Sequence, residues 1–140
     1  MNNKLLTTMF AILAAITLVG AGALFVLLNV NKEGQATTID DVLEASVDVP
    51  EMTTNLLSGE FIRISFKVQT DSKEAKEELE KRSFQVNNLI IKKLSNMTAE
   101  DFQGSKGKVD LEESLKTEIN DLLTDGEIEQ VYITSYILQQ

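Results

Sequence analysis

The longest apolar stretch of the chain runs from Leu5 to Leu28 and contains no charged residue. Lysines lie just outside it, at Lys4 and Lys32. As an α-helix these residues would extend about 36 Å, at ~1.5 Å per residue, and the hydrocarbon core of a bilayer is ~30 Å thick. The pattern therefore predicts a transmembrane helix over residues 5–28, preceded by a short cytoplasmic tip of residues 1–4.

A cleaved signal peptide is the alternative for this stretch, because Gly20 to Ala23 are small, as at a cleavage site. The apolar part of a signal peptide is usually ~7–15 residues long, and this stretch continues through Leu28. The chain has no cysteine for a lipoprotein signal, and the stretch lacks the glutamate of a pilin-type signal. We therefore expect an uncleaved anchor.

The charges beside the stretch indicate its orientation. Lys4 precedes it, whereas Lys32 is followed at once by Glu33. The positive-inside rule then favours a cytoplasmic N-terminus and an extracytoplasmic location for the rest of the chain.

Inside the stretch, small residues recur on one helix face, which makes this face a candidate for packing against another transmembrane helix: Thr7, Ala11, Ala15 and Gly22. The alternative is ordinary composition, because glycine and alanine are common in membrane spans. The stretch contains no acid or base, so it provides no ion path by itself.

Polar residues dominate after the span, and we interpret residues 29–50 as a linker. Thr38 and Asp41 have the spacing of a capping box, which predicts a short amphipathic helix. Pro50 ends this helix and starts an extended stretch. The apolar residues that fall on one side of the helix are Ile39, Val42 and Leu43.

Alternation of apolar and polar residues predicts a hairpin of two strands. The first strand is Met52 to Leu57, the turn is Ser58-Gly59, and the second strand is Glu60 to Gln69. The second strand has the clearest alternation, and its inward residues are expected to be Ile62, Ile64, Phe66 and Val68.

Helical periodicity follows, and it predicts one long helix over Lys73 to Ser95. Phe84 and Ile91 lie opposite its apolar stripe, and we take them as a candidate self-association surface. The residues of the stripe are Ala75, Leu79, Val86, Leu89, Ile90 and Leu94.

A second helix is predicted from a cap at Asp110 to about Leu123, after a loop over Gly104 to Lys108 and before a glycine C-cap at Gly126. The residues expected to face the core are Leu111, Leu115, Ile119 and Leu122, and those expected to face solvent are Glu113, Thr117 and Asn120.

The last predicted strand is Glu129 to Gln139. Apolar residues on both of its faces indicate a central or doubly covered strand. One face would carry Val131, Ile133 and Ile137, and the other Tyr132, Tyr136 and Leu138. The order strand-strand-helix-helix-strand predicts an α+β domain over residues 51–140.

Charge and composition limit the possible functions. The chain of 140 residues carries a net charge of −9, and all 22 acidic residues follow Leu28. Such a surface repels nucleic acid, so we expect no nucleic-acid partner. The chain contains neither cysteine nor histidine, which excludes thiolate and imidazole chemistry.

Carboxylate pairs are the remaining candidates for catalysis, but adjacent residues point to different sides of a helix. We therefore interpret each pair as a solvated face and expect no enzymatic activity, no metal site and no cofactor. The pairs are Asp40-Asp41, Glu77-Glu78 and Glu112-Glu113.

Four segments together resemble the FliL family of flagellar basal body-associated proteins. In order they are FIRISFKVQT, LEKRSFQVNNLIIKKLS, the loop GSKGK with the helix DLEESLKTEIN, and the ending VYITSYILQ. Each segment alone is weak evidence for the resemblance, whereas the order and spacing of all four over nearly the whole chain are specific to the family.

The resemblance implies an extracytoplasmic domain like the stomatin/band 7 core, which oligomerises. It also implies a non-enzymatic scaffold in the cell membrane, as a homo-oligomer or ring around the ion-driven stator units of the flagellar motor, supporting torque, swimming, swarming and chemotaxis. The linker would then face the stator through Ile39, Val42 and Leu43. The alternative is a membrane-anchored envelope binding or assembly factor unrelated to flagella.

Overall fold

We analysed a computed structural model of the chain, which describes residues 2–33 and 37–140, and of residues 28–33 the backbone only. The chain forms two units that meet at Thr37 and Thr38, and each is described by itself. The first unit contains α1 (Asn3–Glu33). Its part from Asn3 to Leu27 is long and apolar enough to cross a membrane, with a mean hydropathy of 2.5.

Helix α1 thus includes the predicted span and continues beyond it. Residues 29–33, which we predicted to be linker, are helical. The hydroxyl groups of the threonines in the span donate to backbone carbonyls within α1: Thr7 to Asn3 at 2.7 Å and Thr17 to Leu13 at 2.9 Å. Residues 34–36 of the predicted linker lie outside the described residues.

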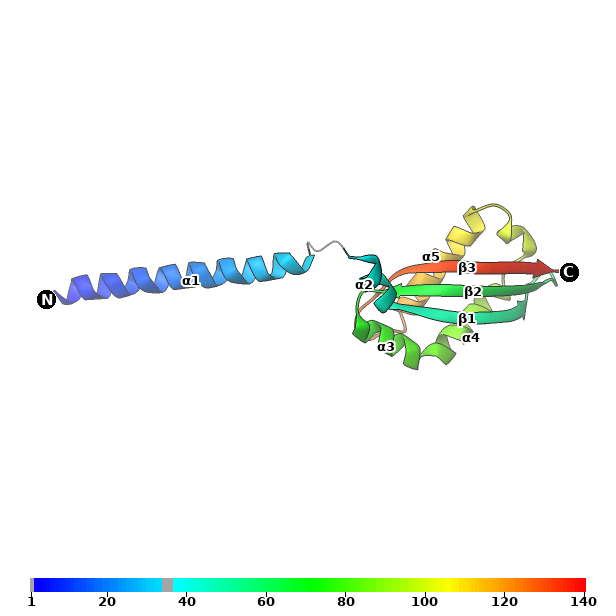
Figure 1. Cartoon of the computed structure of the whole chain (residues 1–140), viewed down its shortest axis with the longest axis horizontal. Coiled ribbons are helices and arrows are strands. Elements are labelled where there is room, and N and C mark those ends of the chain that lie inside the picture. Colours follow the sequence, from blue (N-terminus) through cyan, green and yellow to red (C-terminus); the bar gives the residue numbers. More distant parts are fainter. Residues whose placement is uncertain (1, 34–36) are drawn as a thin grey trace. The chain divides into compact units, whose positions relative to one another are not determined.

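The second unit is built on an antiparallel sheet with the strand order β1-β2-β3 (Figure 1). The strands are β1 (Ser46–Asn55), β2 (Phe61–Thr70) and β3 (Ile128–Gln139). A turn at Ser58-Gly59 joins β1 to β2, as predicted, and Gly59 has a positive φ of 101°.

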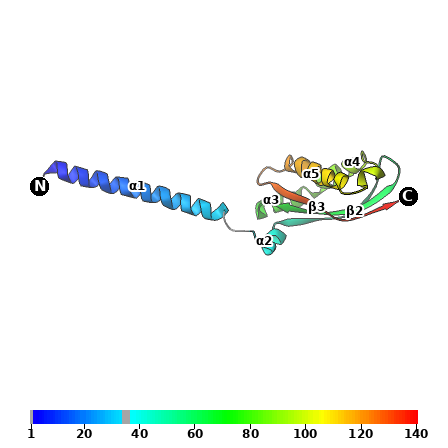
Figure 2. The same ribbon diagram turned by 90° about the horizontal axis from the view of Figure 1, so that it is seen from above.

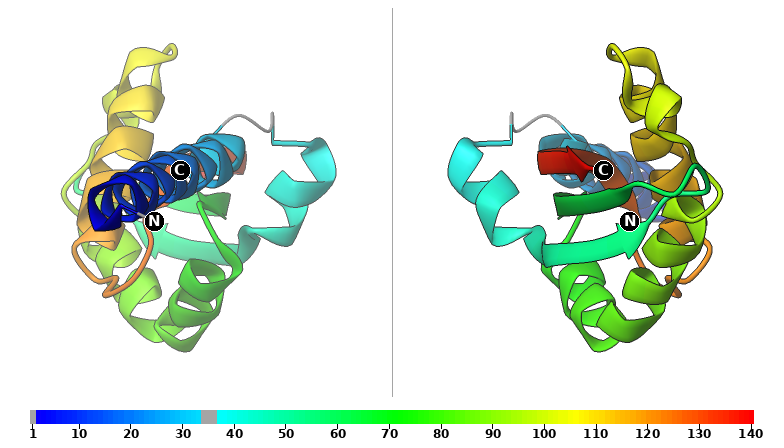
Figure 3. Two further views of the ribbon diagram at one scale, coloured as in Figure 1. Left: turned by 90° about the vertical axis from the view of Figure 1, so that its left-hand side faces the viewer. Right: turned by 90° about the vertical axis from the view of Figure 1, so that its right-hand side faces the viewer.

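Helices cover one face of this sheet, as Figure 2 shows from above. They are α3 (Lys73–Lys81), α4 (Ser83–Leu94), the short 3-10 helix η1 (Ala99–Phe102) and α5 (Lys106–Asn120). Helix α2 (Ile39–Glu44) lies apart from them, on the other side of the sheet (Figure 3). The second unit is therefore an α+β domain, which confirms the predicted class.

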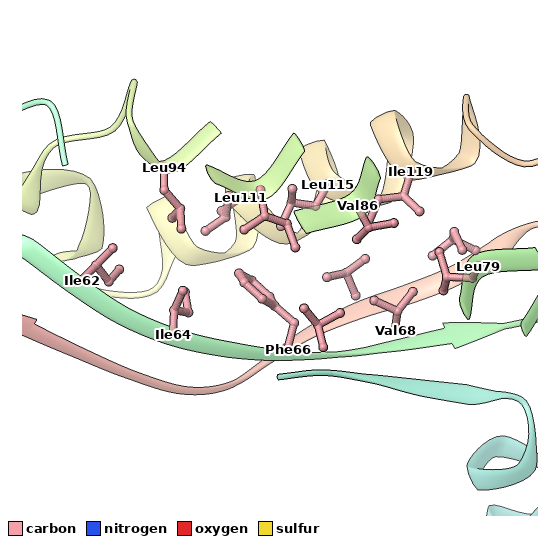
Figure 4. Packing of buried hydrophobic residues seen from close by; sticks show 14 of the residues in the cluster. Ile62, Ile64, Phe66, Val68, Leu79, Val86, Leu94, Leu111, Leu115 and Ile119 are labelled. Atoms are coloured by element: carbon pink, nitrogen blue, oxygen red, sulfur yellow. The ribbon is translucent and has the colours of Figure 1, made fainter. Parts of the chain in front are cut away.

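The hydrophobic core lies between the sheet and its helices (Figure 4). Alternate residues of β2 point into it, as predicted, and are almost fully buried: Ile62, Ile64, Phe66 and Val68. The helices contribute buried residues at helical spacing, among them Leu79, Val86, Ile90, Leu94, Leu111, Leu115 and Ile119. Leu89, which we also expected in the core, is only partly buried.

Strand β1 begins earlier than predicted, at Ser46 instead of Met52, and ends at Asn55. The sheet therefore takes up residues 46–50, which we had assigned to the linker. Pro50 lies inside the strand, at a register shift between Val49 and Met52. A bulge in an edge strand is a place where proline is tolerated, because its missing N–H removes no pairing bond there.

The predicted long helix is wrong at its centre, because α3 ends at Lys81 and α4 begins at Ser83. Arg82 between them leaves the helical conformation, with φ −93° and ψ 11°. Neither glycine nor proline marks the break. The Arg82 side chain instead contacts one residue before it, one residue after it and one far along the chain. The periodicity of a single helix does not predict a contact so distant in the chain.

Helix α5 begins at Lys106, so the predicted loop is correct for Gly104 and Ser105 but wrong from Lys106 to Lys108, and the predicted cap at Asp110 is wrong. The helix also ends at Asn120, and Gly126 lies in the following loop instead of capping it. The Asn120 side chain does not face solvent as expected. Its Oδ1 accepts the Ile128 N–H at 2.6 Å and so holds the start of β3.

Strand β3 is an edge strand, and the expectation of a central or doubly covered strand is wrong. A register shift lies where Ser65 pairs with Ser135 and Phe66 with Ile133, so Thr134 is an extra residue. Because the bulge reverses the alternation, Ile137 falls on the opposite face from Ile133. Tyr136 and Leu138 then share the core face with Ile133, opposite Ile64 and Ile62.

Candidate interaction surfaces

The outer face of α4 carries two large apolar side chains. Phe84 is 70% exposed and Ile91 is 42% exposed. Both lie away from the sheet because α4 turns Val86, Ile90 and Leu94 inward. The predicted outward orientation of Phe84 and Ile91 is confirmed, and their role in self-association stays a prediction.

A shallow groove adjoins Phe84, with a volume of about 350 Å³. Its walls come from α4 and from the turn after α5, which brings Leu122 close to α4 in space. Leu89 lines the groove, which explains why this residue is only partly buried. The complete lining is Phe84, Gln85, Asn88, Leu89, Lys92 and Leu122.

The three apolar residues of helix α2 differ in exposure. Ile39 and Leu43 are exposed, whereas Val42 is half-buried. The predicted capping box is present: the Thr38 N–H donates to Asp41 Oδ2 at 2.9 Å, and the Asp41 N–H donates to Thr38 Oγ1 at 3.2 Å. The Thr38 hydroxyl also donates to Asp41 Oδ2 at 2.7 Å, and this bond, followed by the one from the Thr38 N–H, lowers the pKa of the Asp41 carboxyl.

Helix α2 is fixed to the domain instead of being part of a free linker. The Thr70 N–H donates to the carbonyl of Ala45, which follows α2, at 2.9 Å. Lys73 Nζ lies 2.9 Å from Glu44 Oε2, and this carboxylate raises the pKa of Lys73. A contact of α2 with another protein would therefore be rigidly coupled to the sheet.

The candidate packing face of α1 is fully exposed in the described part of the chain. Thr7, Ala11 and Ala15 are exposed, and apart from the backbone of its own helix nothing lies within 4 Å of a Cβ placed on Gly22. The Thr7 hydroxyl is already bonded within the helix. Packing of this face against another helix stays a prediction.

The predicted carboxylate pairs do not behave as simple solvated faces. Glu78 accepts the N–H groups of Thr124 and Asp125, and Glu112 accepts the N–H of Ile133. Three members of these pairs, Asp40, Glu77 and Glu113, match the expectation of free, wet carboxylates; they are exposed, and none takes part in an ion pair among the described residues. In the described chain no group of three acidic residues is arranged to hold a metal ion.

Glu78 connects α3 to the loop between α5 and β3. Its Oε2 lies 3.0 Å from the Thr124 nitrogen, and its Oε1 lies 2.8 Å from Arg82 Nε. Donation from Thr124 and then from Arg82 lowers the pKa of Glu78 from 4.5 to about 2. Glu78 and Arg82 are four residues apart on a helix, a spacing that favours an ion pair, whereas nothing in the sequence indicates the contact with residue 124.

The low pKa of Glu78 predicts acid sensitivity. A carboxyl whose pKa is lower in the folded state stabilises the fold above its unfolded pKa, and this contribution is lost as pH falls through the folded value. For Glu78 the window runs from about pH 4.5 down to about pH 2. We expect Glu78→Gln to be less stable than wild type at neutral pH, and to lose less stability than wild type across that window.

Urea unfolding of the full chain in detergent, followed by tyrosine fluorescence, measures this difference. Glu77→Gln is the matched control, because the side chain of this exposed neighbour makes no hydrogen bond within the described residues. If the unfolding midpoints of Glu78→Gln and Glu77→Gln change equally with pH, the link through Glu78 does not govern acid stability.

Comparison with known proteins finds a match over the sheet and the helices that cover it. The family model described as "Flagellar basal body-associated protein FliL" matches residues 46–139. This range runs from the first residue of β1 to the last residue of β3. It therefore covers the sheet and the helices on its face, without α1 and α2.

Two flagellar proteins are similar to the chain. "Flagellar protein FliL" of Bacillus subtilis (strain 168) is 46% identical over 121 residues, which cover 86% of each chain. "Flagellar protein FliL" of Aquifex aeolicus (strain VF5) is 25% identical over 93 residues, covering 64% of this chain and 58% of its own length. The first alignment is longer than the α+β domain, so the similarity extends beyond the sheet and its helices.

Proposed function

Because this chain belongs to the FliL family of flagellar basal body-associated proteins, we propose that it is a single-pass membrane scaffold of the flagellar motor. The family is structural or accessory in the flagellum and is not known for enzymatic activity. The observation that carries the proposal is the match of the whole domain from β1 to β3 to this family. In this role the protein holds a folded domain at the basal body and supports rotation by binding, without chemistry.

In our proposal α1 crosses the cytoplasmic membrane with its N-terminus inside. The length and mean hydropathy of α1 support a span, and Lys4 supports the orientation. The acidic domain would then be extracytoplasmic, beside the flagellar basal body. Its likeness to the stomatin/band 7 core is part of the same proposal.

We further propose that copies of the domain assemble around the stator units. Phe84 and Ile91 support this assembly, because two large exposed apolar groups on one helix face are suited to burial between subunits. The exposed Ile39 and Leu43 of α2 support a contact with the stator, since α2 follows α1 closely in the chain and is fixed to the sheet.

Deletion of the gene tests the flagellar role. We expect a deletion strain to spread less than its parent on swarming agar, and a plasmid copy of the wild-type gene to restore spreading. High load is the sensitive condition, because a stator scaffold matters most when torque is limiting. Unchanged swimming and swarming at every load would overturn the flagellar role and favour an envelope assembly factor.

The same strain tests the assembly surface. We expect Phe84→Glu with Ile91→Glu to fold normally, to form smaller oligomers in detergent and to restore spreading poorly. Val109→Glu is the matched control, since Val109 is also an exposed apolar residue, on α5. Full-size oligomers of the double variant would exclude this surface as the interface, without affecting the flagellar role.

A further inference from the structure

On the outer edge of β3, one backbone N–H is hydrogen-bonded to a side chain. Strand β3 pairs with β2 on one side, and on the other side the Ile133 N–H donates to Glu112 Oε1 at 2.8 Å. An unpaired strand edge is a template for another strand, and proteins often place charges there. Glu112 thus occupies a backbone donor that a further strand would use.

Lys108 lies four residues before Glu112 on α5 and covers the same edge. Its Nζ donates to the Tyr136 hydroxyl at 3.0 Å and lies 4.8 Å from the centre of the tyrosine ring. Neither Lys108 nor Glu112 forms an ion pair with another described residue. Both line a hollow of about 460 Å³ together with residues 133–136.

The backbone groups of Ile133 and Tyr136 point the same way. Ile133 is opposite Phe66 and Tyr136 is opposite Ile64, two residues apart on β2. Residues two apart in a strand direct their N–H and C=O groups to the same side. Since the Ile133 N–H points outward to Glu112, Tyr136 also presents its backbone groups to the free edge.

The bulge at Thr134 also places two apolar side chains on the open face of the sheet. Tyr132 pairs with Lys67 and Ile137 with Arg63, both on the polar side of β2. Tyr132 is 44% exposed and Ile137 is 46% exposed. Without the extra residue, these two side chains would lie on opposite faces.

We propose that the free edge of β3 pairs with β3 of a second copy of this chain, antiparallel, about a two-fold axis between Thr134 and Ser135. Ile133 then lies opposite Tyr136 of the second copy, and their outward backbone groups bond to each other. Tyr132 lies opposite Ile137 of the second copy, and an aromatic residue beside a β-branched one is a favourable cross-strand pair.

Charge complementarity identifies the occupant as a second copy. Glu112 is bound at Ile133 and Lys108 at Tyr136. Because the axis sets Ile133 opposite Tyr136, each Glu112 faces Lys108 of the other copy. In the paired state the Ile133 N–H bonds to the added strand instead of to the Glu112 carboxylate. The Glu112 carboxylate then pairs with the ammonium group of Lys108 of the other copy. No other register aligns both the charges and the two apolar residues.

Disulfide crosslinking tests the register, because the chain has no native cysteine. Tyr132 and Ile137 of the two copies would form a pair without backbone bonds, with Cα atoms ~4.5 Å apart, which suits a disulfide. We expect membranes containing both Tyr132→Cys and Ile137→Cys chains, with different tags, to give about tenfold more mixed dimer than either homodimer on mild oxidation. Mixed dimer and homodimers in the proportions that random collision gives would overturn the proposal.

Charge reversal tests the role of Glu112 in the same assay. Glu112→Lys should reduce the mixed dimer about tenfold, because two ion pairs become two repulsions. Adding Lys108→Glu should restore it, and Glu113→Lys, at the exposed neighbour, should have no effect. Failure of the double reversal to restore crosslinking would refute the charge complementarity. None of these readouts depends on motility, so the proposed function is tested separately.

Discussion

Replacing Phe66 by alanine is expected to lower the free energy of unfolding of the domain by about 3–5 kcal/mol. Phe66 is the largest of the fully buried side chains and is 1% exposed. It points from the central strand β2 toward the helices (Figure 4). Alanine would leave a cavity that both layers line, and neither layer can close it without losing contacts elsewhere.

The measurement is urea unfolding of the full chain in detergent, with tyrosine fluorescence as the probe. Both tyrosines lie in β3, which pairs with β2 at Phe66 and its neighbours. Phe84→Ala is the matched control, because this exposed phenylalanine should cost no more than about 0.5 kcal/mol in the isolated chain. Equal losses for the two variants would show that Phe66 does not hold the layers together.

Gly107→Ala is expected to lower the free energy of unfolding by about 2 kcal/mol. A Cβ on Gly107 would lie 1.6 Å from the carbonyl oxygen of Asp101, so backbone must move. Overpacking of this kind costs about 3 kcal/mol, whereas alanine in place of glycine gains only ~1 kcal/mol of helix propensity. The cost of the overlap therefore exceeds the gain in helix propensity, and the substitution is expected to be destabilising.

Thr117→Ala is the control for this substitution, since Thr117 is an exposed residue of the same helix. Alanine there also raises helix propensity, by a few tenths of a kcal/mol, but meets no backbone. The same urea unfolding compares the two variants. A Gly107→Ala protein as stable as Thr117→Ala would mean that η1 and α5 separate at little cost.

The same close approach accounts for the glycines of the GSKGK segment, over which we predicted a loop. The first turn of α5 approaches the carbonyl end of η1 so closely that only glycine fits at position 107. Gly104, just before α5, has a positive φ of 71°, a conformation that favours glycine. Both glycines are therefore required by the local backbone, Gly104 by its positive φ and Gly107 by the close approach of η1.

Features set by neighbouring residues were predicted from the sequence. Alternation along β2 identified its core face, since side chains in a strand point to opposite faces in turn. The capping box at Thr38 and Asp41 was predicted because its bonds join residues three apart. The same holds for the turn at Ser58-Gly59 and for the apolar length of α1.

Features set by residues far apart in the chain were not predicted. The interruption at Arg82 accompanies contacts of Glu78 with the loop at Thr124. The face of Ile137 depends on a bulge that exists only when β3 pairs with β2. Glu112 looked solvated because its partner, the N–H of Ile133, is 21 residues away.

For the candidate surfaces, the sequence alone determined which residues oppose the core stripe of a helix, and so it identified the outward Phe84 and Ile91. It also identified a helix long and apolar enough to cross a membrane, because periodicity and hydropathy are local properties. Only the tertiary structure decided that β3 lies at the sheet edge, that its bulge brings Tyr132 and Ile137 to one face, and that Lys108 and Glu112 flank it. Strand order and long-range hydrogen bonds arise when distant segments pack, and no spacing within one segment encodes them.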